Sequence, residues 1–236
     1  MNKEFDIELQ DSRLNDSLAK ELCDRAIDLS IDYSEIPLDL IINNDLIKEI
    51  PIVKTIFSLG KVGFTVKQMF FIKKLMTFLK EFQTGIIDDE KLSKFNDEMK
   101  TNDKYRGKVT NQILILLDRL LSDIKAKYLA KIFIAYIGGK YDWDTFTDLT
   151  IWLDSMALMD FKLFDFLFNQ TKNIKVSHIS EQLSLDKYLI LAAVQRLRNY
   201  GFIKVVGRTL GQDEFNETIE LSDFGIDFYR NCIKIA

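Results

Sequence analysis

Helix-breaking residues are scarce in this chain, whereas large aromatic side chains are abundant. The 236 residues include 18 Phe but only 10 Gly and 2 Pro. Glycine and proline interrupt helices, and bulky apolar side chains are stable only where they are buried. The contents of 47% hydrophobic and 29% charged residues are typical of a globular protein, not of a disordered chain. We therefore predict a mainly α-helical protein with an aromatic-rich core.

Charge is distributed unevenly along the chain, although the formal net charge is only −4. Residues 1–44 carry 4 Lys/Arg against 11 Asp/Glu and form an acidic arm, whereas residues 45–82 carry 7 against 3 and are basic. The arm either packs permanently against this basic segment or acts as a releasable mask for it. A chain without overall basicity gives no general indication of nucleic-acid binding.

The cell interior is the expected location. The N-terminus lacks the basic start and apolar run of a signal peptide, and no uninterrupted apolar stretch reaches the roughly 18 residues that span a bilayer. The two cysteines, Cys23 and Cys232, lack a C-x-x-C spacing and are expected to be free, buried thiols. These features predict a cytoplasmic protein.

Residues 1–157 are predicted to form a helical bundle. Their clearest amphipathic helix spans residues 65–82, where winding at about 100° per residue gathers Phe, Leu, Ile and Met side chains on one half. The other half collects Lys67, Lys73, Lys74, Thr77, Lys80 and Glu81. We expect the apolar half to fill the bundle core and the lysine half to face water.

Residues 158–236 follow a different pattern. Successive segments are predicted as a helix (161–168), a short strand (173–176), two helices joined by a tight turn (177–183 and 187–200), a hairpin (202–206 and 217–221) and a closing helix (223–233). Two short helices joined by a tight turn form a helix-turn-helix, and a hairpin that follows them adds a wing. We therefore expect a second domain, a winged helix-turn-helix, at 158–236.

Two short motifs of this domain resemble those of a known family. Leu197-Arg198-Asn199-Tyr200-Gly201-Phe202-Ile203 is similar to the L-x-x-x-G-[FLW]-[IV] stretch of bacterial winged-helix proteins of the MarR and PadR groups. Leu221-Ser222-Asp223-Phe224-Gly225-Ile226-Asp227-Phe228 is similar to the L-[ST]-x-x-G-x-x-[FL] stretch that follows their wing. The resemblance covers about one third of the chain and implies a winged-helix fold there.

In winged-helix proteins that read DNA, the second helix of the helix-turn-helix enters the major groove and basic side chains contact phosphates. The side chains expected to be exposed for such a contact, or for a protein partner, are Lys187, Gln195, Arg196, Arg198, Asn199, Lys204 and Arg208. The region is neutral, however, and its wing carries Asp213, Glu214, Glu217 and Glu220. We expect protein contacts, with a second copy of the chain as one partner, and keep nucleic-acid contact as the alternative.

Residue types that carry catalysis are almost absent. His178 is the only histidine, which argues against a multi-histidine metal site, and its place at the start of a predicted short surface helix argues against a histidine-based triad. No phosphate-binding glycine motif is present. Carboxylate pairs such as Asp142 with Asp144 lie at predicted helix starts, where negative charge is favourable. We predict a protein without enzymatic activity, metal, cofactor or small-molecule substrate.

A regulatory or scaffolding binding protein is the predicted function. The alternative is an effector of a bacterial defence system that acts peripherally at a membrane, because lysines opposite an apolar half also suit a lipid interface. Its candidate contacts are Lys54, Lys61, Lys67, Lys73, Lys74 and Lys80. Residues 45–157, with Ile50-Pro51-Ile52-Val53 and the lysine-bearing helix, also resemble uncharacterised bacterial helical proteins, some tied to abortive infection and phage defence, and no activity is transferred from them.

Overall fold

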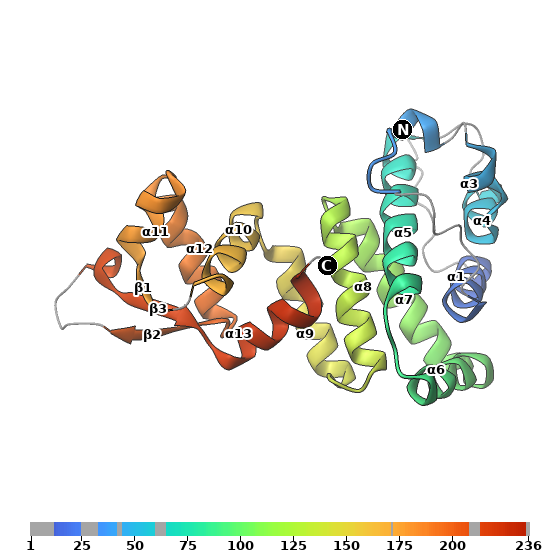
Figure 1. Ribbon diagram of the computed structural model, residues 1–236. Helices are drawn as coiled ribbons and strands as arrows, with labels where there is room; N and C mark the ends of the chain where they lie inside the picture. Colours follow the sequence, from blue (N-terminus) through green and yellow to red (C-terminus); the bar gives the residue numbers. More distant parts are fainter. Residues whose placement is uncertain are drawn as a thin grey trace, which may run out of the picture. The chain divides into compact units, whose positions relative to one another are not determined.

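The protein is mainly α-helical, as its composition predicts (Figure 1). The computed structural model describes residues 12–24, 33–41, 44–59, 65–170, 172–207 and 213–234. The chain divides into two compact units, residues 1–150 and 151–236. The division falls within one helix, ahead of residue 158, where the sequence changes character.

All regular elements in the described part of the first unit are α-helices. They are α1 Ser12–Asp24, α2 Leu38–Ile41, α3 Asp45–Glu49, α4 Pro51–Leu59, α5 Val66–Thr84, α6 Asp89–Thr101, α7 Asp103–Arg119, α8 Asp123–Ile137 and the first part of α9 Trp143–Ser155. Side-chain caps define several boundaries: Thr65 and Gln68 form a capping box at the start of α5. Asn102 ends α6 and caps α7, so one residue separates these two helices.

Phe133 of α8 lies at the centre of the aromatic core of this unit. Its ring centroid is 5.5 Å from that of Phe82, 5.7 Å from Phe95, 5.8 Å from Phe146 and 6.1 Å from Phe78. Helix α5, which carries Phe78 and Phe82, runs beside α8 (Figure 1). The abundance of phenylalanine thus has the structural consequence that the composition predicts.

Helix α5 is buried on more sides than its sequence pattern predicts. Lys74 and Thr77 lie on the half that the sequence predicts to face water, yet they are only 6% and 2% exposed. The Lys74 ammonium donates to the backbone carbonyls of Asp118 (3.2 Å) and Leu120 (2.6 Å) at the end of α7. The last carbonyls of a helix have no partner within it and attract a cation. The prediction of a solvent-facing lysine half is therefore wrong for Lys74, which fastens α5 to α7.

The second unit combines helices with a small antiparallel sheet. Its elements are the end of α9, α10 Leu158–Phe168, β1 Ile174–Lys175, α11 Val176–Leu183, α12 Lys187–Asn199, β2 Ile203–Gly207, a 3₁₀ turn Glu214–Asn216, β3 Thr218–Leu221, α13 Asp223–Phe228 and a π-helical turn Tyr229–Ile233. The strand order is β1-β3-β2. The predicted hairpin is present as β2 and β3, with Ile203 opposite Leu221.

The two sequence motifs of this unit meet at the base of the hairpin. Gly201 adopts a φ of 75° and ends α12. The Ser222 hydroxyl donates to the Gly201 carbonyl (2.6 Å) and accepts from the Gly225 amide (2.9 Å), and the Ser222 amide donates to the Phe202 carbonyl (2.9 Å). A Cβ atom on Gly225 would overlap that same carbonyl of Phe202. The two motifs are therefore the two halves of one contact, which we call the hairpin clasp.

Phe202 is also the centre of a second aromatic core. Its ring stacks on Phe228 (4.6 Å, 18°) and Phe224 (5.4 Å, 13°) and meets Trp152 edge-on (5.6 Å, 87°). Trp152 belongs to the last turns of α9, whereas Phe146 of the same helix packs on Phe133. This change of partners along α9 explains why the division between the units falls inside the helix.

Candidate partner-binding surface

Helix α12 has one buried and one exposed face. At 100° per residue, positions 188, 192, 195 and 199 fall on one side and the buried apolar positions on the other. The side chains of this outward stripe are all uncharged: Tyr188, Ala192, Gln195 and Asn199. The buried ones are Ile190, Ala193, Val194 and Leu197. Of the residues predicted for this surface, Asn199 is exposed and Gln195 half-buried.

Arg196 is held inside the unit by a buried carboxylate. Its Nε lies 2.9 Å and 3.0 Å from the two carboxylate oxygens of Asp160, and its Nη2 lies 2.7 Å from Oδ1. The Asp160 side chain is fully buried and also accepts from the Ala157 amide at the start of α10 (2.8 Å). The hydrogen bonds with Asp160 raise the pKa of Arg196. This bidentate pair ties α12 to α10.

Arg198 is paired in a similar way, with the hairpin. Its Nη1 lies 3.3 Å from Oε2 of Glu217, a residue that is only 2% exposed. Both arginines of α12 were expected to be exposed contacts, yet about one third of each side chain is exposed, 34% for Arg196 and 36% for Arg198. Their charges are used within the unit, because a buried carboxylate requires a partner.

An aromatic cluster occupies the start of α12. The rings of Tyr188 and Phe215 meet edge-on at 5.5 Å, and Lys187 Nζ lies 5.1 Å and 5.0 Å from their centroids. Tyr188 is 63% exposed and its neighbour Leu189 is 54% exposed. We call these four residues the α12 cluster. It places apolar surface beside the turn between α11 and α12, with Lys187 as its cation.

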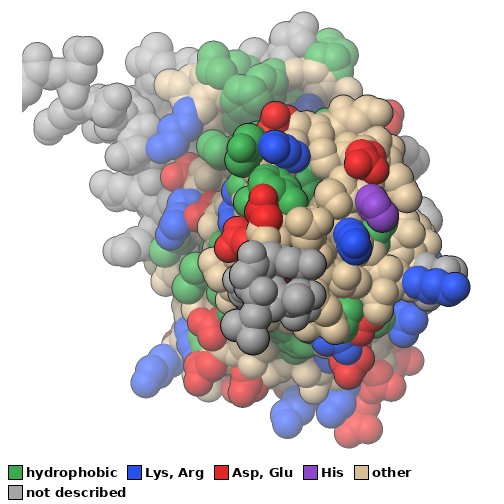
Figure 2. All heavy atoms as spheres, turned by 90° about the vertical axis from the view of Figure 1, so that its left-hand side faces the viewer, with side chains coloured by type: hydrophobic (Ala, Val, Ile, Leu, Met, Phe, Trp, Pro, Cys, Tyr) green, Lys and Arg blue, Asp and Glu red, His purple; other side chains and the backbone are tan. Residues whose placement is uncertain are grey.

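The remaining residues of the predicted set do not join into one cationic surface. Lys204 pairs across the hairpin with Glu220 (3.1 Å), and this hydrogen bond raises the pKa of Lys204. Arg208 lies outside the described residues. Figure 2 looks onto the hairpin end of Figure 1, and it shows hydrophobic side chains with both signs of charge interspersed around them. A duplex-binding face would need a continuous positive field instead.

The lysines proposed for membrane contact are individually paired or buried. Lys54 lies 2.6 Å from Glu49, Lys67 lies 3.7 Å from Asp118, and Lys73 lies 3.2 Å from Asp123. Lys74 is buried against α7, Lys80 is half-buried, and Lys61 lies outside the described residues. Among the residues that the structure describes, Lys54, Lys67 and Lys73 are therefore engaged with carboxylates, and Lys74 is not accessible to a lipid surface.

Several features of this surface were missed by sequence reasoning. Asp160 is the one acidic residue in the first turn of a strongly apolar helix, which signals an internal partner. Glu217 directly precedes an alternating strand. Phe215 lies in a turn-rich segment where an aromatic residue has no local role. None of these patterns identifies its partner, because the partners are distant in the chain.

The groups that could support catalysis lie apart or are poorly activated. The Tyr105 and Tyr136 hydroxyls are 3.0 Å apart beside a hollow of about 370 Å³, and burial raises the pKa of both, so they remain neutral. Burial also raises the pKa of the Cys23 thiol. His178 is exposed on α11, away from either cysteine in sequence. This arrangement offers no activated nucleophile at these positions.

The described residues contain neither a candidate metal cluster nor a helix that could span a membrane. Among them, no group of three or more His, Cys, Asp or Glu side chains is placed to hold a metal ion. Within the same ranges, no helix combines the length and the apolar character needed to cross a bilayer. Comparison with protein-family models, with curated proteins and with solved structures finds no match for this chain.

Proposed function

We propose that residues 151–236 form a winged-helix domain that binds a protein partner, within a non-enzymatic regulatory or scaffolding protein. The order helix, strand, two helices and hairpin, with β3 between β1 and β2, supports the winged-helix assignment. So does the hairpin clasp, because it gives both family-like motifs a shared structural role.

The observation that favours a protein partner is the uncharged outward stripe of α12. Nucleic-acid affinity depends on cations that neutralise phosphates, each contributing through counterion release. The helix has three basic residues, of which Arg196 and Arg198 are paired with buried carboxylates. The centres of protein interfaces are instead depleted in charge and enriched in aromatic residues. Tyr188, Leu189 and Ala192 have this character.

Site-specific photo-crosslinking tests the proposal in cells that express the full chain. A photoreactive amino acid at Ala192 is expected to give a protein adduct of defined mass, and the same amino acid at Gly107 of α7 serves as the control. Changing Tyr188 and Leu189 together to Asp is expected to abolish the adduct, because charge then enters the contact. An adduct that contains a second copy of this chain would identify self-association.

Fluorescence anisotropy with a labelled DNA duplex of random sequence tests the nucleic-acid alternative. We expect no binding of the duplex at about 0.15 M salt, because the exposed face of α12 carries little positive charge that is not already paired. Arg196 and Arg198 are unsuitable for this test, since each is bonded to a buried carboxylate and its replacement would disturb the unit itself. Salt-dependent binding that weakens on Lys187→Gln, together with no adduct at Ala192, would refute a protein-binding role for this face.

A further inference from the structure

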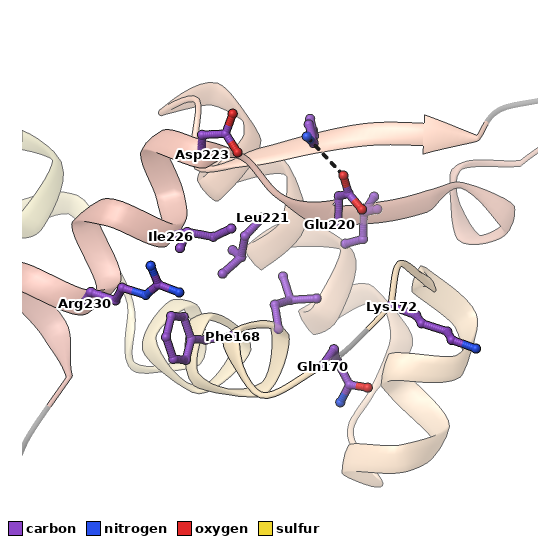
Figure 3. A pocket seen from close by; sticks show the side chains of 11 residues that line it. Phe168, Gln170, Lys172, Glu220, Leu221, Asp223, Ile226 and Arg230 are labelled. Carbon is purple, nitrogen blue, oxygen red and sulfur yellow. Dashed lines mark ion pairs between the residues drawn. The ribbon is translucent and has the colours of Figure 1, made fainter.

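A second surface of residues 151–236 lies away from the stripe of α12. It is a groove of about 430 Å³ between β3, α13 and the end of α10 (Figure 3). Its lining combines apolar side chains with charged ones: Leu167, Phe168, Gln170, Lys172, Lys204, Ile219, Glu220, Leu221, Asp223, Ile226 and Arg230. Figure 3 shows Phe168 and Arg230 toward one end and Gln170 and Lys172 toward the other. The volume falls within the range of binding pockets, about 300–1,000 Å³.

The groove contains a strand edge with which none of the described residues pairs. β1 pairs with β3 only at Ile219 and Thr218, so no β1 residue stands opposite Leu221. Residues along an antiparallel strand direct their backbone groups alternately to either side. The bond from the Ser222 amide to the Phe202 carbonyl (2.9 Å) shows that Ser222 faces β2. The amide and carbonyl of Leu221 therefore face the groove, on the side where β1 has already diverged.

Positive charge remains available at both ends of the groove. Within the described part of the chain, neither Lys172 nor Arg230 forms an ion pair, whereas Glu220 is already paired with Lys204. Asp223 is the other acidic residue of the lining, so the net charge is positive. The Arg230 guanidinium lies 5.6 Å from the ring centroid of Phe168, which stacks on Tyr229 at 4.3 Å. An arginine supported on a ring is preorganised for a carboxylate.

We infer that this groove binds an extended peptide segment that carries an acidic residue. The peptide backbone pairs with Leu221 as an added strand, its acidic side chain binds Arg230, and its apolar side chains rest on Leu221 and Ile226. Strand addition derives affinity from main-chain hydrogen bonds and specificity from neighbouring side-chain sites. A compact organic acid would use Arg230 but would leave the Leu221 edge unpaired. The combination of free edge and free cation favours a peptide.

The test uses ¹⁵N-labelled full-length protein and a defined probe, the capped pentapeptide acetyl-Thr-Val-Glu-Val-Thr-amide. Titration with this peptide is expected to give saturable chemical-shift changes in NMR spectra for the Leu221 amide and for the Arg230 Nε–H. The same peptide with Lys in place of Glu is expected to bind about tenfold more weakly, because the charged hydrogen bond is lost. Arg230→Gln is expected to weaken binding of the Glu peptide by about the same factor. Lys162→Gln changes an exposed lysine of α10 outside the groove and should leave the affinity for this peptide unchanged.

Three results would overturn the inference. The first is the absence of any saturable shift at Leu221 with the Glu peptide. The second is a Leu221 amide that is strongly protected from hydrogen exchange in the free chain, since the edge would then already be paired. The third is sodium hexanoate shifting the same resonances while the peptide does not, which would assign the groove to small organic acids. Crosslinking at Ala192 reports on α12 alone, so this inference and the proposed function fail independently.

Discussion

Glu21 is a buried carboxylate on α1 whose surroundings compensate for its burial only in part. It is 2% exposed, and among the described residues neither of its oxygens is hydrogen-bonded. Burial raises its pKa, and the nearby Ile52 amide and Lys20 charge offset this only in part. The neutral acid is therefore the form that suits the folded protein. Its stabilising contribution is fully present below the ordinary pKa of Glu and is lost as the pH rises through the folded-state value.

We expect Glu21→Gln to stabilise the first unit near neutral pH, by on the order of 1 kcal/mol. The variant keeps the size of the side chain but cannot ionise. The gain should shrink as the pH falls and vanish well below about pH 4, where Glu21 is protonated in both states. Urea unfolding at several pH values measures this difference. Asp97→Asn, an exposed change on α6, should show no such pH-dependent gain.

The pairing of Asp160 with Arg196 could not be predicted from the sequence. Its position in the first turn of a helix suggests a favourable dipole interaction, which the Ala157 amide supports. Its larger role, the bidentate pair with Arg196, joins residues that are 36 positions apart. Sequence patterns identify local capping, but they carry no information on which distant cation a buried carboxylate meets. For the same reason Arg196 was predicted as an exposed contact.

Replacing Asp160 with Ala should destabilise the second unit by about 2 kcal/mol, since it leaves Arg196 unpaired and the Ala157 amide without its acceptor. This loss of stability is smaller than the loss for a fully buried ion pair, because Arg196 is about one third exposed. Thermal unfolding followed by circular dichroism provides the measurement. Glu220→Gln breaks the exposed pair with Lys204 and should leave the midpoint unchanged. Equal effects of the two changes would contradict this assignment.

At the scale of elements, helices with strong caps were predicted best. Asp142 and Ser222 cap the starts of two helices where the sequence places them, and Gly138 ends α8. These signals are local, so the sequence contains them in full. Predictions that required knowledge of neighbours did less well. Nothing in residues 65–82 reveals that Lys74 meets the end of α7, because those carbonyls lie 44 and 46 positions further along the chain.

The hairpin clasp predicts opposite effects for two glycine substitutions. Gly225→Ala should destabilise the second unit by about 2 kcal/mol or more, because the added methyl group meets the backbone of Phe202, which cannot move freely. Gly107→Ala should stabilise the first unit by about 0.5–1 kcal/mol, because Gly107 lies inside α7 with open space around it. Differential scanning calorimetry of both variants decides this. A neutral Gly225→Ala would show that α13 does not lie this close to Phe202.

At the scale of the whole molecule, each unit has its own aromatic core and its own tryptophan. Trp143 packs on Phe146 (5.2 Å) and Tyr136 (5.4 Å) in the first unit. Trp152 stacks on Tyr200 (5.5 Å) in the second. The composition predicts aromatic cores, but it does not predict that the two tryptophans of one helix report on different ones, since their side chains are similar and their partners are remote.

These tryptophans allow unfolding of the two units to be followed separately. In a Trp143→Phe background, Gly225→Ala should lower the fluorescence midpoint of the remaining Trp152. In a Trp152→Phe background, the same glycine change should leave the Trp143 midpoint in place, because the substituted contact lies in the other core. Equal shifts of both signals would show that the two units unfold as one cooperative body.

The hairpin clasp also has an evolutionary consequence. Because Gly201 and Ser222 close on each other where the two strands meet α12 and α13, the segment between them is anchored at both ends regardless of its length. Lengthening a closed loop is thermodynamically inexpensive, with about 0.6 kcal/mol for each doubling. Related chains are therefore free to vary the number and kind of residues after Gly207, provided that they keep Gly201, Ser222 and Gly225. Insertions and tags introduced there should be tolerated without loss of the fold.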